Sequence, residues 1–464
     1  MLKCYKFLSL FCCAITLVNY AVYGQSTESD KISAYINKAN QIGLFNGNIL
    51  VIDHGKVVYK AAIGYADASK QIPLSTSYRF HIGSIAKEFD AVGIMMLKEE
   101  GKLSLDDKVS KFFPELPSWA EKISIKNLLQ YTSGLPDVKW RTVTSDADNW
   151  KDLEALKQLD FEPGTGYAYN NNNTFLRRKI IEKVTGMTIK DFIEQKMLKP
   201  FGIYSGVVDP TDSEPLMAKS FNDNYRQDAL IYPISGWVCL NIDDFNKWAA
   251  CIKNFKIISA ASTREILTPI APGKQCGLGF GTMNGDTLLS HVHDGIALHY
   301  QALEVTEALN DRTIILLTNQ RHDNVYDLNT AIEAILDGKT YEQPRKSILK
   351  EYQKQLDTIS AKQALLLYHD LKIKSPEAYG FDNENTLNEI GYFYMDKNQL
   401  DDAVSIFEYN TMLFPASGNV YDSLGEAYNK KGDKQKALIN YKKSVALDPT
   451  NSSAKEIIQG LEKQ

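Results

Sequence analysis

Cysteine is scarce in this sequence, and its placing excludes a fold built on disulfide bonds. The 464 residues contain six cysteines, of which three lie in the first 24 residues. The other three, Cys239, Cys251 and Cys276, allow one internal bridge at most and lack the spacing of zinc ligands. With 44% hydrophobic and 23% charged residues, the chain has a globular composition and enough length for two domains with a sizeable core.

The sequence also lacks an excess of positive charge. Its formal net charge at pH 7 is −5. A mildly acidic chain has no general electrostatic attraction for nucleic acid or for an anionic membrane surface. We therefore expect neither of them as a partner.

The apolar run near the N-terminus is too short for a comfortable membrane span, which takes about 20 residues. This run, residues 7–18, follows two lysines and gives way to polar residues at Gln25. The pattern predicts a signal peptide over residues 1–24 and an exported mature protein, periplasmic or secreted, without a transmembrane segment. Cys12 and Cys13 leave a lipoprotein as the less favoured alternative, because the residue before them fits a lipid-attachment signal poorly.

Two predicted hairpins, with helices between them, indicate an α+β fold. The first hairpin covers residues 46–67 around a turn at 53–56, and the second pairs residues 300–309 with 312–320. A short strand leads to Ser84, beyond which apolar residues recur at helical spacing. The simplest arrangement is an antiparallel sheet built from both ends of this region, with helices between and around it.

The C-terminal part of the chain repeats itself with a period of 34 residues. The coinciding pairs are Gly391 and Gly425, Tyr394 and Tyr428, Ala403 and Ala437, Phe407 and Tyr441, and Pro415 and Pro449. Period and residue order resemble tetratricopeptide repeats, which are helix pairs that stack into a solenoid. We place them at residues 381–464, with a capping helix over 452–464. Because two repeats are few for independent stability, we expect the helical linker, residues 341–380, to pack against them.

A serine and a lysine three residues apart occur at three places in the chain: Ser84/Lys87, Ser347/Lys350 and Ser452/Lys455. The last two lie in solvated helical segments and fit surface pairs. The first stands at a predicted helix N-terminus, where Lys87 can approach the Ser84 hydroxyl. The helix dipole there favours a neutral amine and developing negative charge on a nucleophile.

Two other segments carry residue types that assist a serine nucleophile. In "PGTGYAYNN", Tyr169 and Asn171 lie two apart and so on the same side of an extended segment. A phenol near an ammonium can have a lowered pKa and act as a base, and Asn can orient an amide. In "LLSHVHDG", a strand leads to His293, which can bind a carboxylate or shuttle a proton, and to Gly295, which lets a substrate approach the backbone. Each segment alone also fits a structural role.

Six segments, taken in order, resemble the successive blocks of the serine β-lactamase-like family, which includes class C β-lactamases, D-alanyl-D-alanine peptidases and related esterases. They are "RFHIGSIAKEFDAVGIMMLKEEGKLSLDDKVSKFFPELP", "IKNLLQYTSGLPD", "PGTGYAYNN", "GWVCLNIDDFNKW", "HDG" and "IILLTNQ". The resemblance runs over about residues 30–340. It implies that residues 25–340 form a catalytic domain of β-lactamase/transpeptidase-like fold, an antiparallel sheet flanked by helices plus a helical domain.

The resemblance also implies a serine hydrolase that acts on a small-molecule or peptide substrate through an acyl-enzyme, without metal or organic cofactor. Seven residues would form the site: Ser84 as nucleophile, Lys87 as its proton-handling partner, Tyr169 and Asn171 as the Tyr-x-Asn element, His293 and Gly295 at the Lys-Thr-Gly position, and Ile296, whose N–H would complete the oxyanion hole with that of Ser84.

Three departures from the family pattern concern the substrate more than the nucleophile. His293 stands where many relatives have the lysine of Lys-Thr-Gly, Tyr131 where a His is common, and His299 where a Gly is common. Replacing the ammonium that would hold a penicillin carboxylate weakens the case for a β-lactamase. We therefore favour a D-amino-acid peptidase or an esterase over a true β-lactamase, although all three would share these residues.

Three other classes of protein compete with this interpretation. A metal hydrolase would draw on His291, His293 and Asp294, with His299 nearby, but the remaining histidines are isolated and the spacing is not that of a helical metal motif. No Gly-x-Ser-x-Gly elbow of an α/β-hydrolase occurs. The main alternative is a binding module that has lost turnover and recognises a cell-wall peptide or a protein through the repeats. In the hydrolase, the repeats would bind a protein partner, mediate self-association or brace the catalytic domain.

Overall fold

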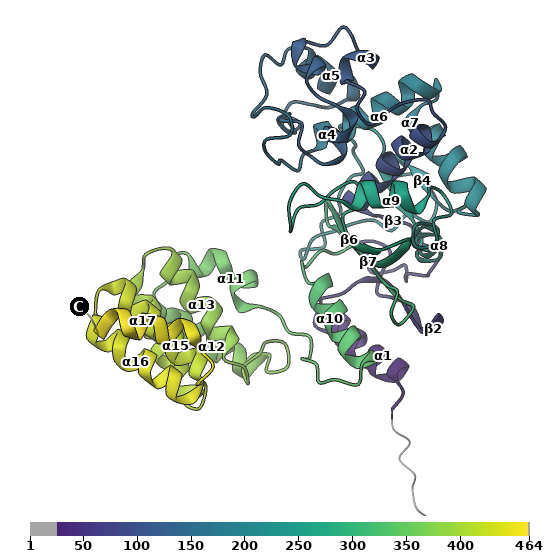
Figure 1. The fold of residues 1–464 in the computed structure, drawn as a ribbon. Helices are drawn as coiled ribbons and strands as arrows, with labels where there is room; N and C mark the ends of the chain where they lie inside the picture. The colour runs from purple at the N-terminus through teal and green to yellow at the C-terminus, as the bar shows by residue number, and fades with distance from the viewer. Residues whose placement is uncertain (1–25, 463–464) are drawn as a thin grey trace, which may run out of the picture.

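A computed structural model describes residues 26–462 of the protein (Figure 1). The predicted signal peptide, residues 1–24, with Cys12 and Cys13, lies outside these residues. Between residues 26 and 462, no helix combines the length and the apolar character that a membrane span requires.

The larger part of the chain is built on a six-stranded antiparallel sheet in the order β2-β1-β9-β8-β7-β6. The strands are β1 (Gly47–Asp53), β2 (Lys56–Ile63), β6 (Phe280–Asn284), β7 (Thr287–Ala297), β8 (Tyr300–Glu307) and β9 (Arg312–Thr318). Both predicted hairpins are present, and β1 of the first pairs with β9 of the second. The sheet therefore unites both ends of the region, as expected.

Helices cover both faces of this sheet, because apolar residues alternate between its two sides. Ile49 and Val51 of β1 pack with α1 (Glu28–Gln41) and α10 (Val325–Leu336). Leu50 lies in a second core, which also contains residues of α2 (Lys87–Glu99) and α8 (Ile242–Lys253). The helix that begins at Lys87 is thus held against the sheet face opposite to α10.

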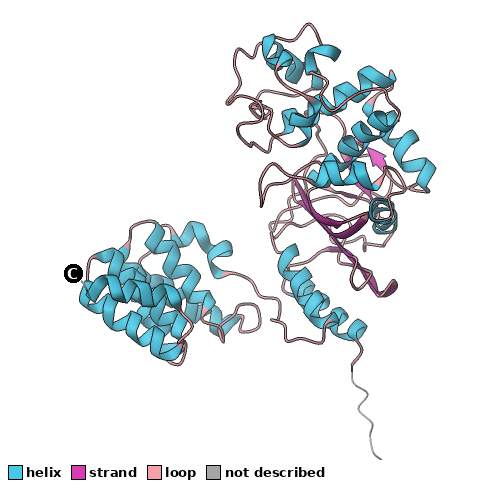
Figure 2. Ribbon diagram, viewed as in Figure 1, coloured by secondary structure: helices cyan, strands magenta, loops and turns pink. Residues whose placement is uncertain are grey.

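The remaining elements of this part form a helical region and a small sheet in the order β3-β5-β4, seen as helices and short strands in Figure 2. They are β3 (Phe80–His81), β4 (Val207–Val208), β5 (Val238–Leu240), α3 (Val109–Phe112), α4 (Ile125–Leu129), α5 (Asp146–Glu154), α6 (Asn171–Thr185), α7 (Ile189–Phe192), α9 (Ala260–Leu267), the 3-10 turns η1 (Gly83–Ala86), η2 (Ser118–Glu121) and η4 (Lys199–Phe201), and the π-helical turn η3 (Ile193–Leu198). The predicted α+β fold with a helical domain is confirmed.

The C-terminal part is all helical and has its own hydrophobic core. Its helices are α11 (Ile348–Leu356), α12 (Ala361–Lys374), α13 (Asn385–Asp396), α14 (Leu400–Leu413), α15 (Gly418–Lys431), α16 (Lys434–Leu447) and α17 (Ser452–Glu462). A Cβ at Gly391 would meet the Phe407 ring, and one at Gly425 the Tyr441 ring, which explains why both repeats place a glycine there.

The helices before the repeats pack against them, as expected from the small number of repeats. Apolar residues of α11 and α12 belong to the same core as those of α13–α16. The Tyr394 hydroxyl also donates to the carbonyl of Ile359 at 2.9 Å. The predicted domain boundary at 340/341 falls between α10 and α11, and the exact boundaries stay a prediction.

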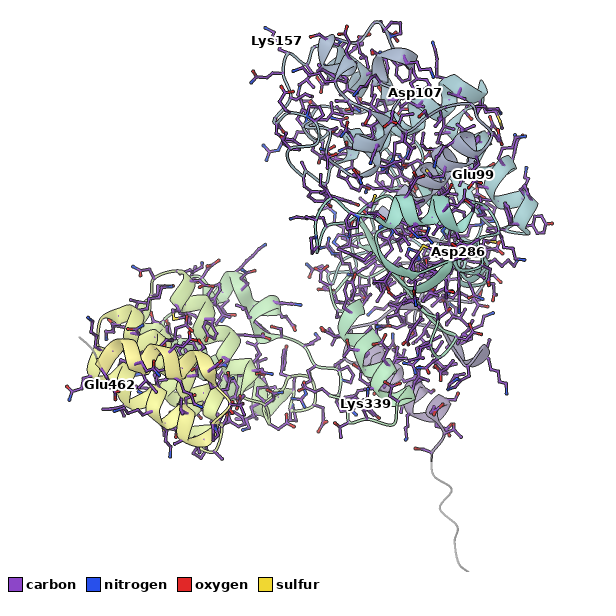
Figure 3. All side chains as sticks on the ribbon, in the orientation of Figure 1. Glu99, Asp107, Lys157, Asp286, Lys339 and Glu462 are labelled. Atoms are coloured by element: carbon purple, nitrogen blue, oxygen red, sulfur yellow. The ribbon has the colours of Figure 1, made fainter. Side chains whose placement is uncertain are left out.

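Charged side chains of both parts lie mainly at the periphery. Figure 3 labels six of them, among which Lys157, Asp286, Lys339 and Glu462 are exposed to solvent. This distribution is the ordinary one for a water-soluble surface. Several of the charged groups that are buried, among them Lys87, Glu88 and Asp90, follow Ser84 in the same segment.

Candidate active site

Ser84 lies in the 3-10 turn η1, between strand β3 and helix α2. The expected helix N-terminus is therefore present, with the serine one turn ahead of the α-helix itself. Gly83 adopts a left-handed φ of 58°, and a Cβ at this position would overlap the backbone nitrogen of Ile296. A glycine is needed here because the turn and strand β7 are in direct backbone contact.

Lys87 points at the serine. Its Nζ lies 2.8 Å from the Ser84 Oγ, and the residue is 2% exposed. Burial, together with repulsion from the nearby Arg178 guanidinium, lowers the pKa of Lys87 to about 7, although Asp90 partly opposes this. Near neutral pH a large fraction of Lys87 is therefore a free amine.

His81 supports the turn that carries the serine. Burial, together with repulsion from Lys87 and Arg178, lowers the pKa of His81 to about 3. Its neutral ring can therefore use Nδ1 as an acceptor, and the Gly83 N–H donates to it at 2.9 Å. His81 is isolated in the sequence and belongs to no motif that would predict this role.

Tyr169 closes over the pair from another segment. The Lys87 Nζ lies 5.0 Å from the centre of the Tyr169 ring. Burial raises the pKa of Tyr169 to about 12, and a hydrogen bond with Ser84 offsets this only in part. The expected lowering of this pKa is not found, because burial of the phenol outweighs the nearby positive charge of Arg177. Tyr169 is a protonated phenol at neutral pH.

Asn171 is the first residue of helix α6 and is turned towards Asp137. The Asn171 backbone N–H donates to Asp137 Oδ1 at 2.8 Å, and its side-chain amide does so at 3.4 Å. Within residues 26–462 the buried Asn171 Oδ1 has no hydrogen-bond partner. The Asn171 side chain is thus held by Asp137, and its own carbonyl oxygen is buried.

Strand β7 brings Gly295 and Ile296 against the nucleophile turn. A Cβ at Gly295 would overlap the carbonyl oxygen of Ile82 and lie 2.8 Å from the Ser84 nitrogen. Glycine at position 295 therefore allows the backbones of η1 and β7 to touch. This contact brings together the segments whose N–H groups, those of Ser84 and Ile296, were expected to form an oxyanion hole.

His293 is bound from behind by a buried carboxylate. Its Nδ1 lies 2.7 Å from Glu88 Oε1, and 3% of its side chain is exposed. Glu88 also contacts His291, with 3.0 Å between Oε1 and Nε2, and accepts from the Trp248 indole at 2.7 Å. His293 is therefore part of a buried polar network rather than an exposed group free to follow a substrate carboxylate.

Opposite charges within this network stabilise one another and shift the pKa values of the groups that carry them. Burial lowers the pKa of His291, but Glu88 and Glu304 outweigh it and hold that pKa well above its ordinary value. Burial raises the pKa of Glu88, and the two histidines more than offset this, so the net direction is downward. His291 is consequently an imidazolium beside the Glu88 carboxylate at neutral pH.

Among the described residues, the same three side chains form the group that could hold a metal ion. Ligand atoms of Glu88, His291 and His293 all lie within 4.8 Å of one another. Two other residues weighed for a metal site point elsewhere: Asp294 accepts from the Tyr326 hydroxyl at 2.9 Å, and His299 contacts Asp228 at 2.8 Å. The 2.7 Å spacing between Glu88 and His293 is that of a direct hydrogen bond, whereas the 3.0 Å contact between Glu88 and His291 is an ion pair, because His291 Nε2 is hydrogen-bonded to the Leu278 carbonyl oxygen at 2.9 Å.

A second buried charge cluster fixes the helix of the nucleophile from its other side. The Asp90 carboxylate contacts the guanidinium groups of both Arg177 and Arg178, and all three side chains are at most 1% exposed. The arginines belong to α6, the helix that begins at Asn171. The Ser84 and Tyr169 segments are therefore joined by ion pairs, and no local sequence pattern predicts these contacts.

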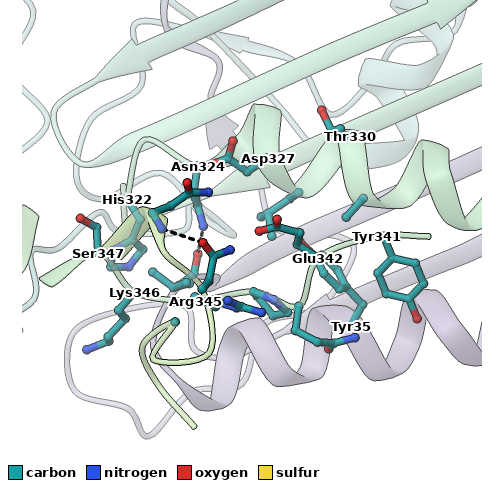
Figure 4. Close-up of a pocket in the computed structure, with 18 of the residues that line it drawn as sticks. Tyr35, His322, Asn324, Asp327, Thr330, Tyr341, Glu342, Arg345, Lys346 and Ser347 are labelled. Carbon is teal, nitrogen blue, oxygen red and sulfur yellow. Dashed lines mark hydrogen bonds between the residues drawn. The ribbon is translucent and has the colours of Figure 1, made fainter. Parts of the chain in front are cut away.

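A cavity of about 550 Å³ lies elsewhere, at the junction with the C-terminal part (Figure 4). Tyr35 of α1, Asn324 before α10 and Arg345 before α11 are among its lining residues. Neither Ser84 nor Lys87 lines it. Its size alone does not make it the site of chemistry.

Comparisons with known proteins agree with this geometry. The family model described as Beta-lactamase matches residues 34–338. The chain belongs to the beta-lactamase family. A tetratricopeptide repeat model matches residues 418–451, so the beta-lactamase part is followed by the predicted type of repeat.

Curated relatives of this beta-lactamase family chain are bacterial. It is 28% identical over 353 residues to penicillin-binding protein 4* of Bacillus subtilis strain 168, which covers 68% of this chain and 77% of the relative. It is 26% identical over 319 residues to the putative penicillin-binding protein PbpX of the same strain, covering 67% and 78%.

Solved structures with the same fold have diverse names. A penicillin-binding protein from Bacillus halodurans has a TM-score of 0.57 at 21% identity and covers 65% of this chain and 98% of its own. The D-amino acid amidase from Ochrobactrum anthropi SV3 has a TM-score of 0.57 at 20% identity, covering 68% and 99%. A class C beta-lactamase has a TM-score of 0.56 at 20% identity, covering 68% and 97%. These similarities establish the beta-lactamase fold.

Proposed function

We propose that this protein is a serine hydrolase that cleaves an ester or amide carbonyl through an acyl-enzyme on Ser84. The observation that carries the proposal is the pair formed by Ser84 and Lys87. Their hydrogen-bonding atoms are 2.8 Å apart, and the pKa of Lys87 is lowered to about 7. A serine hydroxyl becomes a good nucleophile when a neighbouring base takes its proton, and a neutral lysine at this distance is such a base.

The proposed reaction has two halves. Ser84 Oγ bonds to the carbonyl carbon while its proton moves to Lys87 Nζ, and the oxyanion is stabilised by the N–H groups of Ser84 and Ile296. The bond to the leaving group then breaks, and the proton passes from Lys87 to that group with the Tyr169 phenol as relay. Water attacks the acyl carbon with Lys87 again taking the proton, and the acid product leaves Ser84 restored.

We propose D-amino-acid peptides or small esters, rather than β-lactams, as substrates. The β7 strand presents His293 and Asp294 where many relatives carry Lys-Thr. His293 is hydrogen-bonded to Glu88, and the Asp294 carboxylate lies close enough to raise the pKa of the Tyr169 phenol. Neither side chain is a lysine that could hold the carboxylate that penicillins carry.

The protein is further proposed to work outside the cytoplasm, in the periplasm or secreted, with its repeats bound to a protein partner. The signal-peptide pattern in residues 1–24 and the match of residues 418–451 to a tetratricopeptide repeat support this. The mass of the protein recovered from expressing bacteria tests the export step, since cleavage after residue 24 predicts an N-terminus at Gln25.

The proposed reaction is tested by the intact mass of the protein after incubation with a fluorophosphonate and, separately, with a penicillin. We expect one fluorophosphonate adduct on the wild type and none on Ser84→Ala. Slow or absent labelling by penicillin is expected because His293 replaces the lysine that would hold its carboxylate. No adduct on folded wild-type protein with either reagent would favour the alternative of a binding module, which recognises its ligand through the repeats.

A further inference from the structure

We propose that Glu88 is a positioning residue whose carboxylate ties strand β7 to the helix of the nucleophile and thereby sets the separation of the two oxyanion N–H groups. This inference rests on the proposed hydrolase function. It gives His293 a role different from the one that its place in the sequence implies, since the ring would act through the backbone of its strand.

The contacts connect the two segments that must meet. Glu88 follows Lys87 in the first turn of α2, and its Oε1 lies 2.7 Å from Nδ1 of His293 and 3.0 Å from Nε2 of His291. Both histidines lie on β7, two residues apart and so on the same side of the strand. One carboxylate oxygen therefore spans two successive side chains of the strand and restrains its distance and its rotation.

The tie lies next to the backbone contact that forms the site. His293 is two residues before Gly295, and Glu88 is four residues after Ser84. Between them, η1 and β7 touch so closely that a Cβ at Gly83 would overlap the nitrogen of Ile296. Because the two N–H groups sit on these touching segments, a small shift of β7 relative to α2 changes their separation directly, and oxyanion stabilisation depends on donors about 3 Å from the oxygen.

The carboxylate is held on its other side as well. Its Oε2 accepts from the Trp248 indole N–H at 2.7 Å, and Trp248 stacks on Phe89 with 3.8 Å between ring centres. Trp248 lies on α8 and does not belong to β7. It restrains Glu88 without joining the two segments, so it offers a matched control with a comparable buried contact.

Four variants separate this role from the alternatives: Glu88→Gln, His293→Leu, His293→Asn and, as control, Trp248→Phe. Glu88→Gln keeps the shape of the side chain but removes the charge of the carboxylate, which strengthens its contacts with the two histidines of β7. His293→Leu removes the donor, whereas His293→Asn keeps an N–H near the position of Nδ1 but has nothing in place of Nε2. An imidazole that touches the substrate through Nε2 would not be replaced by Asn.

The assay is steady-state and burst kinetics with a p-nitrophenyl ester, together with the rate of fluorophosphonate labelling, well below each variant's Tm. We expect Glu88→Gln and His293→Leu to lower kcat by tenfold or more with KM within about twofold, because the interaction matters in the transition state. His293→Asn should recover most of the activity lost in His293→Leu. Trp248→Phe should lower the Tm and leave kcat within about twofold.

Different failures have different meanings. A wild type that is never acylated at Ser84 defeats the proposed function itself. A wild type that is acylated normally, with Glu88→Gln and His293→Leu equally fast, defeats the positioning role alone. Equal loss in His293→Asn and His293→Leu would assign the imidazole to the substrate. One zinc ion per chain in the purified protein, with activity lost on chelation, would replace the hydrogen-bonded tie by a metal.

Discussion

Replacing Lys87 by methionine should stabilise the protein against unfolding while it slows the proposed reaction. Lys87 is 2% exposed, and in residues 26–462 no carboxylate lies within ion-pair distance of its amine. Methionine has similar length and no charge, so it fills the same space without a desolvated amine. The difference in unfolding free energy between the two proteins therefore measures how much the buried lysine destabilises the native state.

The magnitude follows from the pKa. It falls from the ordinary 10.5 to about 7, and each pH unit of difference corresponds to about 1.4 kcal/mol. The lysine thus destabilises the native state by about 5 kcal/mol at low pH, less about 1 kcal/mol for its hydrogen bond with Ser84. Between pH 7 and 10.5 the unfolded chain binds one more proton than the native one, so wild-type stability rises with pH relative to the variant by up to about 1.4 kcal/mol per pH unit.

Urea unfolding followed by tryptophan fluorescence at pH 6, 7, 8 and 9 measures this. All five tryptophans lie between residues 119 and 248, so the signal reports on the catalytic part and not on the repeats. We expect Lys87→Met to be the more stable protein by a few kcal/mol at pH 6, with the gap shrinking steadily above pH 7. A gap that is independent of pH, or a less stable variant at pH 6, would refute a buried lysine of lowered pKa.

In the wild type, kcat/KM should rise with pH through about 7, and Lys87→Met should lose about 10²–10⁴-fold in kcat.

Three other substitutions test neighbouring parts of the site. Gly295→Ala places a Cβ against Ile82 and Ser84, so fluorophosphonate labelling should slow by at least about 10²-fold, whereas Gly460→Ala, with open space around its Cβ, should label at the wild-type rate. Tyr169→Phe should reduce kcat for an amide more than for a p-nitrophenyl ester, because an amine leaving group needs the proton and a nitrophenolate does not; equal losses on both would exclude the phenol as relay. Arg177→Met leaves the buried Asp90 carboxylate with one partner fewer and should cost about 3–5 kcal/mol in urea unfolding, and a loss below 1 kcal/mol would contradict the role of this ion pair.

Features that depend on nearby residues could be predicted from the sequence. The turn between β1 and β2 was marked by His54 and Gly55, which both adopt positive φ in the structure. The repeats were marked by their period, and the contact of Ser84 with Lys87 by a spacing of three residues in a helical context. Each of these signals lies within a single element or between adjacent ones.

The rest depends on which distant segments meet. Glu88 and His293 are 205 positions apart, and Asp90 and Arg177 are 87 apart, so no spacing in the sequence announces either contact. The pKa of Tyr169 could not be predicted for a related reason. Its direction depends on the burial of the phenol and on the nearby positive charge of Arg177, and both follow from packing rather than from the residue types.

The first turn of α2 explains why one of its buried charges is reactive and the others are not. Glu88 is matched by two histidines of β7, and Asp90 by two arginines of α6. Lys87, between the nucleophile and these acids, has a neutral serine as its nearest polar partner. A buried lysine that has no counter-charge avoids the cost of burial by losing its proton. The segments that hold α2 in place therefore also leave Lys87 as the group that becomes neutral. The basicity that activates Ser84 is therefore a consequence of how the neighbouring charges are paired, and it arises when β7 and α6 have both docked on this helix.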